Sequence, residues 1–325
     1  MARNYFLPKL FCYILYMINT RTNYIDLARF VGIYAVVLGH FAPFEGVTDG
    51  IGRELIYMFH VPLFFVISGM LSKPASISRT FYSLMIPYFI YNIISIAKMD
   101  FMALFTFDAL ELNNSPTWFF AALFFIKVIS DYINKGILYY IGAFIAVTVI
   151  CHYLNVGIPR FMGLHAVVYG MPFFLFGKYI KDKMPSLLAT GAVVLCVCTV
   201  ILICVFFCYE RFDLYSLEIH NPLVYFVSSA MATILVLIAC NRIFVYIPEG
   251  FHKFVLMNSR GTMFILGTHY IALGILSKYV IPGIHLPFLL KALIVLLSSI
   301  PYYYIIKYTY DRIPVLYGKK RNQRA

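Results

Sequence analysis

Apolar runs long enough to cross a lipid bilayer recur along the whole chain, and they constrain its fold more than any other feature. An α-helix rises about 1.5 Å per residue, so about 20 apolar residues span about 30 Å of hydrocarbon. The sequence therefore predicts an all-α, polytopic membrane protein with about ten transmembrane helices. We expect them over residues 24–44, 54–71, 81–97, 118–133, 137–154, 162–180, 186–209, 222–247, 262–281 and 286–307.

Composition supports a lipid environment and excludes other classes. Hydrophobic residues make up 62% of the chain and charged residues 12%, whereas soluble domains carry about 25% charged residues. The net charge of +12 would suggest nucleic acid as a partner of a soluble protein. Here the basic residues lie between apolar runs, where they set topology and contact anionic lipid, so we expect no nucleic-acid partner. The seven cysteines lack metal-type spacing, and no metal site is expected.

The distribution of basic residues predicts the orientation, because Lys and Arg accumulate in cytoplasmic loops. If both termini are cytoplasmic, most of the 26 basic residues fall on the inner side. The few expected on the outer side are Arg53, Lys98, Arg160, Arg211 and Lys278. This asymmetry predicts a multi-pass protein of the inner (cytoplasmic) membrane, although one misplaced span would reverse all loops that follow it.

The two ends of the chain are expected to differ from a ten-helix membrane domain over residues 23–310. Residues 1–22 form an N-terminal extension whose apolar stretch is too short to span. Met17 is an alternative start, which would make residues 1–16 non-native, and an interfacial segment is the other interpretation. Residues 311–325 form a basic cytoplasmic tail, whose Gly-Lys-Lys-Arg sequence is interpreted most simply as an anchor to lipid.

The first span carries three ionisable residues, Asp26, Arg29 and His40. Ionisable groups within a membrane are costly and mark functional sites. At about 100° per residue, Arg29 and His40 fall on one face of the helix, about 16 Å apart along its axis. Asp26 lies on the same side, within reach of an ion pair with Arg29. The structural alternative is an interfacial Asp–Arg pair and a packing histidine.

The second span contains His60 two residues before Pro62, which frees a backbone carbonyl group within the span. His40 and His60 both fall in the outer half of neighbouring antiparallel helices, so their rings could face each other. A neutral histidine suits a general base near pH 7. A structural hydrogen bond is the alternative for His60.

Four weaker candidates could line a polar cavity or bind a substrate. Each has a structural alternative: an interfacial tryptophan, a lysine that snorkels to the interface, or a histidine bonded to a backbone carbonyl. They are Trp118, Lys127, His165 and His269.

At these residues the chain resembles the acyltransferase 3 family of bacterial membrane acyltransferases. The order and spacing of the matching sequences are specific, and the resemblance extends from Asn23 over nearly the whole chain. The matching sequences are Asp26-Leu-Ala-Arg29, Val36-Val-Leu-Gly-His40, Phe59-His-Val-Pro-Leu-Phe-Phe-Val-Ile-Ser-Gly69, Ile86-Pro-Tyr-Phe89, Trp118-Phe-Phe and, more loosely, the stretch from Asn258 to His269.

The resemblance implies an O-acetyltransferase, an enzyme that transfers groups other than aminoacyl groups. It would move an acyl group, usually acetyl, from acyl-CoA to a hydroxyl of a cell-surface polysaccharide or glycolipid. Arg29 and His40 correspond to the family's essential arginine and histidine. The basic cluster that the family often shows before its third span is reduced here to Lys73 and Arg79, which are expected to bind acyl-CoA. Acetyl-CoA is then a co-substrate, and no bound cofactor is expected.

The expected mechanism makes His40 the base that takes the proton of the acceptor hydroxyl. Asp26 and Arg29 would shape a donor channel, which is needed because His40 lies nearer the outer face than the cytoplasmic acyl-CoA. His60 would orient His40 or the sugar, and a covalent acyl-histidine is an alternative route. Rival functions are a polysaccharide or glycolipid transporter and a structural partner in glycan synthesis. The acceptor and the oligomeric state, including a homo-oligomer, stay open.

Overall fold

The computed structural model describes residues 24–41, 47–96, 115–133, 135–156, 163–189, 199, 212–214, 218–280 and 286–320, and they are almost entirely helical. A helix over residues 24–39 comes first. The helices after it are α2 (Val47–Met70), α3 (Ile77–Ile96), η2 (Ser115–Thr117), α5 (Trp118–Ser130), α6 (Ile137–Tyr153), α7 (Leu164–Ile180), α8 (Met184–Ala189), α10 (Pro222–Phe244), α11 (Glu249–Arg260), α12 (Thr262–Ile275), η4 (Leu276–Val280), α13 (Phe288–Thr309) and η5 (Pro314–Tyr317). Two short strands, β1 (Phe212–Asp213) and β2 (Glu218–Ile219), pair antiparallel.

The all-α membrane prediction is confirmed, with the β1–β2 pair as the one local exception among the described residues. Within that part of the chain, four helices are long and apolar enough to cross a membrane: Gly50–Met70, Pro222–Phe244, Thr262–Val280 and Phe288–Thr309. Three shorter apolar helices, α5, α6 and α7, begin within two residues of predicted spans. The total of ten crossings and the cytoplasmic location of the termini stay predictions.

The structure bears differently on the span predicted over 186–209 and on the loop predicted after the eighth span. Of the predicted span over 186–209, the structure describes α8, which ends at Ala189, and residue 199. The predicted loop after the eighth span is in fact largely helical, because it contains α11. Charged residues lower the mean hydropathy of α11, so a search for apolar runs misses it. Its aromatic side chains Phe251 and Phe254 nevertheless pack against Phe30, with ring centroids 6.5 and 6.0 Å apart. Residues 1–22 lie outside the described residues.

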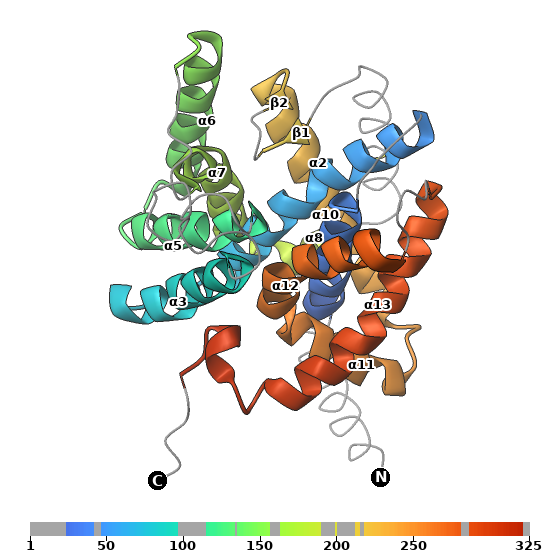
Figure 1. The fold of residues 1–325 in the computed structure, drawn as a ribbon. Helices are drawn as coiled ribbons and strands as arrows, with labels where there is room; N and C mark the ends of the chain where they lie inside the picture. The colour runs from blue at the N-terminus through green and yellow to red at the C-terminus, as the bar shows by residue number, and fades with distance from the viewer. Residues whose placement is uncertain are drawn as a thin grey trace, which may run out of the picture.

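The central helix is α2, which packs against α7 on one side and α10 on another. Figure 1 shows α3, α5, α6 and α7 gathered on one side of the bundle and α11, α12 and α13 on the other. At the α2–α7 crossing, a Cβ atom added to Gly69 would overlap the carbonyl oxygen of Phe174, and one added to Gly177 would overlap that of Val66. Small residues let two backbones approach this closely without water between them.

The helix over residues 24–39 is fixed against α11 by polar contacts. The Tyr34 hydroxyl donates a hydrogen bond to Oδ1 of Asn258 over 2.7 Å. The Ser259 hydroxyl donates to Oδ1 of Asp26 over 2.6 Å. Both acceptor and donor on α11 belong to the Asn258-Ser-Arg sequence. These bonds hold the rotation of the helix and therefore decide which of its side chains face the interior.

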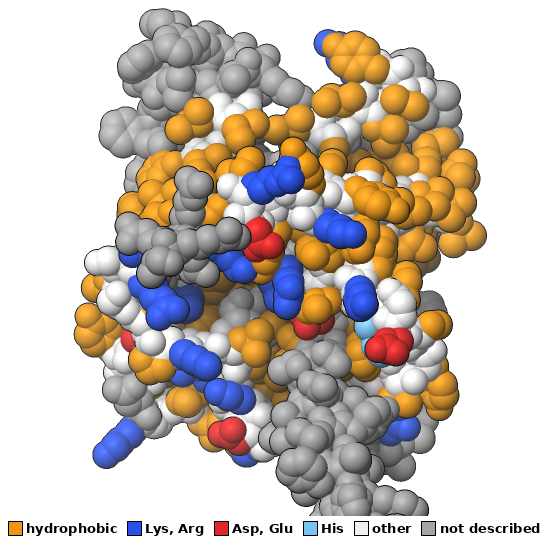
Figure 2. Space-filling model, turned by 90° about the horizontal axis from the view of Figure 1, so that it is seen from below, with side chains coloured by type: hydrophobic (Ala, Val, Ile, Leu, Met, Phe, Trp, Pro, Cys, Tyr) orange, Lys and Arg blue, Asp and Glu red, His pale blue; other side chains and the backbone are white. Residues whose placement is uncertain are grey.

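Basic side chains gather on one face of the molecule. Figure 2 views the model from below and shows many Lys and Arg side chains with few acidic ones between them. In Figure 1 this is the side where α11 and η5 lie.

Candidate active site

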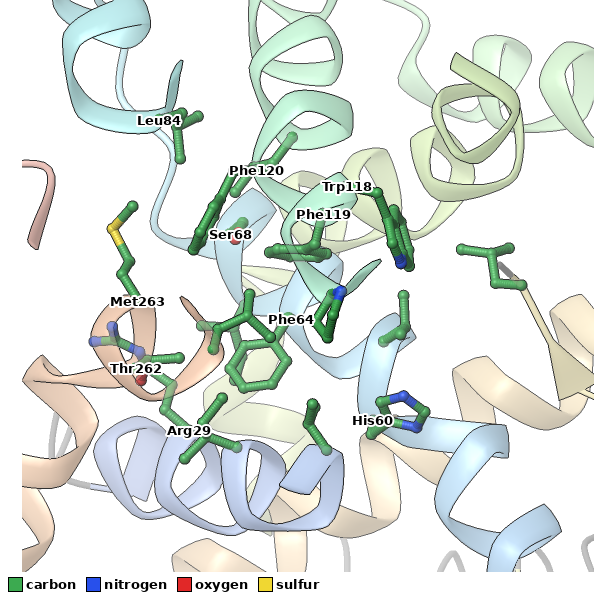
Figure 3. Close-up of a pocket in the computed structure, with 18 of the residues that line it drawn as sticks. Arg29, His60, Phe64, Ser68, Leu84, Trp118, Phe119, Phe120, Thr262 and Met263 are labelled. Carbon is green, nitrogen blue, oxygen red and sulfur yellow. The ribbon is translucent and has the colours of Figure 1, made fainter. Parts of the chain in front are cut away.

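A cavity of about 550 Å³ lies inside the bundle, beside the helix over residues 24–39. That helix contributes Arg29, Ile33, Val36 and His40, whose spacing puts them on one face. Figure 3 shows the middle of the cavity, where aromatic side chains of α2 and α5 predominate. The rest of the wall comes from α2, α3, α5, β1, α12 and the C-terminal segment, and includes Tyr57, His60, Phe64, Ser68, Ser83, Trp118, Phe119, Lys127, Asp213, Thr262, Met263, Tyr270, Tyr317 and Gly318.

One end of the cavity is marked by Arg29. Its Nη1 lies 3.7 Å from Oδ1 of Asp26, the ion pair that the sequence spacing predicts. Asp26 also accepts the hydrogen bond from Ser259. Asp26 does not line the cavity, so it pairs with the guanidinium on the side away from the cavity. Figure 3 shows the Arg29 side chain reaching toward Thr262 and Met263 of α12.

The other end contains His40, whose ring is held by a second histidine. Nδ1 of His40 lies 3.0 Å from Nε2 of His269. Nδ1 of His269 lies 3.0 Å from the carbonyl oxygens of Ile265 and Leu266. A carbonyl oxygen can only accept, so Nδ1 of His269 carries a hydrogen, and Nε2 of the neutral ring is an acceptor. His40 must then donate from Nδ1, which leaves the lone pair of its Nε2 free for the cavity.

His269 is fully buried, whereas His40 lines the cavity. The two rings stack with centroids 5.1 Å apart. His60 is the predicted neighbour of His40, but the ring that bonds to His40 is that of His269. Nδ1 of His60 bonds instead to the carbonyl oxygen of Ile56 over 2.7 Å, one turn back in its own helix. His60 still lines the cavity, with its ring 5.0 Å from that of Tyr57.

The model of the acyltransferase 3 family, an acyltransferase domain, matches residues 22–308. The chain belongs to this family. Neither the curated proteins nor the solved structures gave a match. Family membership makes the chain a membrane acyltransferase and gives the cavity a reaction class.

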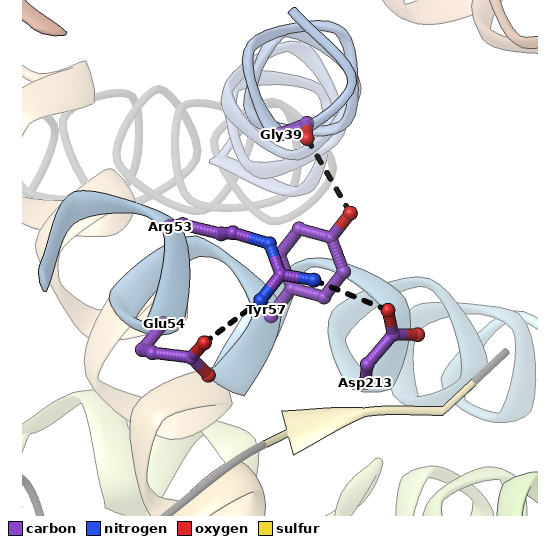
Figure 4. Close-up of polar contacts among 5 residues, drawn as sticks. All are labelled: Gly39, Arg53, Glu54, Tyr57 and Asp213. Carbon is purple, nitrogen blue, oxygen red and sulfur yellow. Dashed lines mark hydrogen bonds and ion pairs between the residues drawn. The ribbon is translucent and has the colours of Figure 1, made fainter. Parts of the chain in front are cut away.

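The end of the acyltransferase cavity near His40 carries a charged cluster that sequence reasoning missed (Figure 4). Arg53 Nη1 lies 2.9 Å from Oε1 of Glu54, and its Nη2 lies 3.3 Å from Oδ2 of Asp213. The guanidinium also lies 4.4 Å from the centroid of the Tyr57 ring, and Tyr57 donates to the carbonyl oxygen of Gly39 over 3.4 Å. Asp213 and Tyr57 line the cavity. Only the alternation of a basic and an acidic residue at 53–54 hinted at an ion pair.

The end near Arg29 is also lined by Lys127, Ser83 and Gly318. Lys73 and Arg79, the predicted acyl-CoA ligands, are exposed and are not among the lining residues. Arg79 is close enough to Lys127 for their charges to interact.

Two further candidates from the sequence lie side by side. Trp118 lines the cavity. His165 does not line it, but lies fully buried behind Trp118, with ring centroids 6.3 Å apart. In the described part of the chain, no group of three or more His, Cys, Asp or Glu side chains could hold a metal ion.

Proposed function

We propose that this acyltransferase transfers a short acyl group, acetyl in the first place, from acyl-CoA to a hydroxyl of a cell-surface polysaccharide or glycolipid. One observation carries the proposal: a single cavity is lined by both Arg29 and His40, and His40 presents a free ring nitrogen. A guanidinium suits an anionic donor, and an imidazole nitrogen suits removal of a proton from an alcohol. The cavity therefore contains a group suited to donor binding and a group suited to proton removal.

The shape of the site fits a donor with a long flexible arm. Arg29 and His40 lie about 16 Å apart along one helix. Aromatic side chains line the same cavity, among them Phe64, Phe119 and Phe120 (Figure 3). Such a lining receives a slender arm while the charged head group stays near Arg29 and Lys127. Acyl-CoA has this construction, with its phosphates at one end and its thioester at the other.

The reaction then proceeds at His40. The acceptor oxygen attacks the thioester carbonyl carbon while Nε2 of His40 takes the hydroxyl proton. The tetrahedral intermediate expels the CoA thiolate, which receives that proton from the imidazolium. The products are an acyl ester and CoA thiol, and the ring returns to its starting tautomer. In the alternative route, Nε2 itself attacks the thioester carbonyl carbon and expels the CoA thiolate, which leaves an acyl-histidine. The acceptor hydroxyl then attacks the acyl carbon, the imidazole leaves, and the hydroxyl proton passes to the thiolate.

The polar groups at the His40 end suit a sugar. Tyr57, His60 and Asp213 line this end together. Nδ1 of His60 is occupied by Ile56, so its Nε2 is an acceptor for a hydroxyl hydrogen. Aromatic side chains beside carboxylate and imidazole acceptors bind the apolar faces and the hydroxyls of a sugar at the same time.

The test uses purified protein in liposomes with acetyl-CoA and candidate glycan acceptors. We expect acceptor-dependent release of CoA thiol and new O-acetyl groups, measured by a thiol assay and NMR. The His40→Ala protein should release none above background at normal protein levels. Unchanged transfer by His40→Ala would remove His40 from the mechanism. Glycan transport without thiol release would favour the rival function, a transporter.

A further inference from the structure

The chain after α13 does not leave the bundle but folds back across it. Figure 1 shows η5 (red) beneath α3, away from the end of α13. The Tyr91 hydroxyl donates to the carbonyl oxygen of Leu316 over 2.8 Å, and the ring of Tyr317 stacks on Phe264 at 5.7 Å. The Tyr317 hydroxyl also bonds to Thr309 over 2.5 Å. Residues 314–320 are therefore docked against the bundle.

Gly318 fixes the direction of this segment. Its φ of 65° lies in the left-handed region that glycine adopts without strain. A Cβ atom added here would also overlap the carbonyl oxygen of Ser83 in α3. Tyr317, Gly318 and Ser83 all line the cavity. The docked segment is therefore part of the cavity wall, at the end that contains Lys127.

The next two residues bring positive charge to the same place. Nζ of Lys319 lies 3.7 Å from the centroid of the Tyr310 ring, and Nζ of Lys320 lies 5.4 Å from that of Tyr82 in α3. Both lysines are exposed. Neither lysine lines the cavity, but both follow directly on Tyr317 and Gly318, which do.

The end of the cavity beside these lysines holds more cations than acids. Arg29 and Lys127 line the cavity, and Arg79 lies near Lys127. The acids close to them are Asp26, which pairs with Arg29, and Asp131, which interacts with Lys127. A concave site lined by an excess of one charge raises the local concentration of ligands of the opposite charge.

We propose that residues 314–320 form one wall of the donor site and that Lys319 and Lys320 bind phosphate groups of the nucleotide thioester. This inference rests on the proposed function and adds residues to its donor site. Anionic lipid head groups offer the same phosphate chemistry. The cavity-lining position of Tyr317 and Gly318 favours a ligand that enters the protein.

The test measures donor dependence in liposomes of zwitterionic lipid. Two donors are compared: acetyl-CoA and S-acetylpantetheine, which has the thioester arm but no phosphate. The double variant Lys319→Ala/Lys320→Ala should raise the Michaelis constant for acetyl-CoA roughly 5- to 30-fold. Each exposed lysine–phosphate pair strengthens binding up to about fivefold, and the variant removes two such pairs. Its kcat and its Michaelis constant for acetylpantetheine should not change.

Two further variants separate charge from position. Lys307→Ala/Arg312→Ala removes two exposed cations that also lie over tyrosine rings, and should leave both Michaelis constants unchanged. Gly318→Ala keeps both lysines but displaces the segment that carries them, and should also raise the Michaelis constant for acetyl-CoA. Thermal melting checks that this variant folds.

The inference is overturned if the lysine variant leaves the constant for acetyl-CoA unchanged or raises both constants equally. An effect that occurs only in liposomes with anionic lipid would likewise overturn it, because the lysines would then bind head groups. If the wild type fails to use acetyl-CoA at all, the proposed function fails instead. Calorimetric measurement of adenosine 3′,5′-diphosphate binding then tests the site independently of turnover. Loss of binding in the lysine variant supports the site, and equal binding refutes it.

Discussion

Replacing His269 with Phe tests the role that the structure gives to the buried histidine. Phenylalanine keeps a ring in the space but removes the acceptor that lies 3.0 Å from Nδ1 of His40. The His40 ring would then be free to adopt the other tautomer or to rotate. In either state, Nε2 no longer presents its lone pair to the acceptor hydroxyl. We therefore expect kcat to fall while the Michaelis constants for donor and acceptor change little.

The size of the loss follows from the hydrogen bond. A buried N–H group that loses its partner is destabilised by about 1–3 kcal/mol. The productive arrangement of His40 loses that stabilisation, so its population, and kcat with it, should fall about 5- to 150-fold. Removing the base itself should cost more, about 100- to 10,000-fold, the usual contribution of general base catalysis. His269→Phe should therefore be slower than wild type but faster than His40→Ala.

Two controls distinguish positioning from simple packing. His269→Gln places an amide oxygen near the position of the lost nitrogen and should recover most of the activity. The double variant His40→Ala/His269→Phe should be no slower than His40→Ala alone, because His269 acts only through His40. The assay is the acetyl-CoA turnover rate in liposomes. Additive losses in the double variant, or equal activity of the Phe and Gln variants, would refute the assignment.

Three more substitutions test other parts of the structure. Gly69→Ala forces a methyl group against a backbone carbonyl oxygen of α7 and should lower the free energy of unfolding by about 3 kcal/mol or more. The control Gly142→Ala lies in open space on α6 and should change the melting temperature little. Asp213→Asn should raise the Michaelis constant for the acceptor about fivefold and leave that for the donor unchanged, because the carboxylate lines the cavity at the His40 end. The Glu54→Gln control removes the other partner of Arg53 without touching the cavity, and a rise as large as that of Asp213→Asn would contradict an acceptor role. Arg29→Lys keeps the charge but loses the planar fork, so the donor constant should rise about tenfold; an unchanged constant would exclude a donor role for Arg29.

The sequence predicted best what lies within single helices. The period of 3.6 residues placed Arg29 and His40 on one face, and both line the same cavity. The three-residue spacing predicted the Asp26–Arg29 ion pair, which is confirmed. Hydropathy located the apolar helices to within a few residues at most of their ends but missed α11, whose apolar stripe is diluted by charge. These features depend on local geometry, which a single sequence contains.

Contacts between distant segments could not be predicted in the same way. His40 and His269 are 229 residues apart, and Arg53 and Asp213 are 160 apart. Two histidines on adjacent spans seemed the natural partners, but the rotation of each helix, set by contacts such as Tyr34 with Asn258, decides which rings meet. The docking of Gly318 against α3 is a contact of the same kind, which the basic composition of the tail did not predict.

The choice of a neutral histidine as the partner of His40 follows from the surroundings of the site. Many hydrolytic and transfer enzymes orient their catalytic histidine with a carboxylate, whose charge also stabilises the imidazolium. His269 is fully buried in an apolar bundle, where an unpaired carboxylate would cost several kcal/mol or take up a proton. A second imidazole fixes the tautomer through one N–H and two backbone carbonyl oxygens and brings no net charge into the membrane. Asp213, the carboxylate that lines the cavity at the His40 end, is paired instead with Arg53. In the proposed mechanism the His40–His269 pair is thus neutral at rest, and it carries a positive charge only while the proton is on His40.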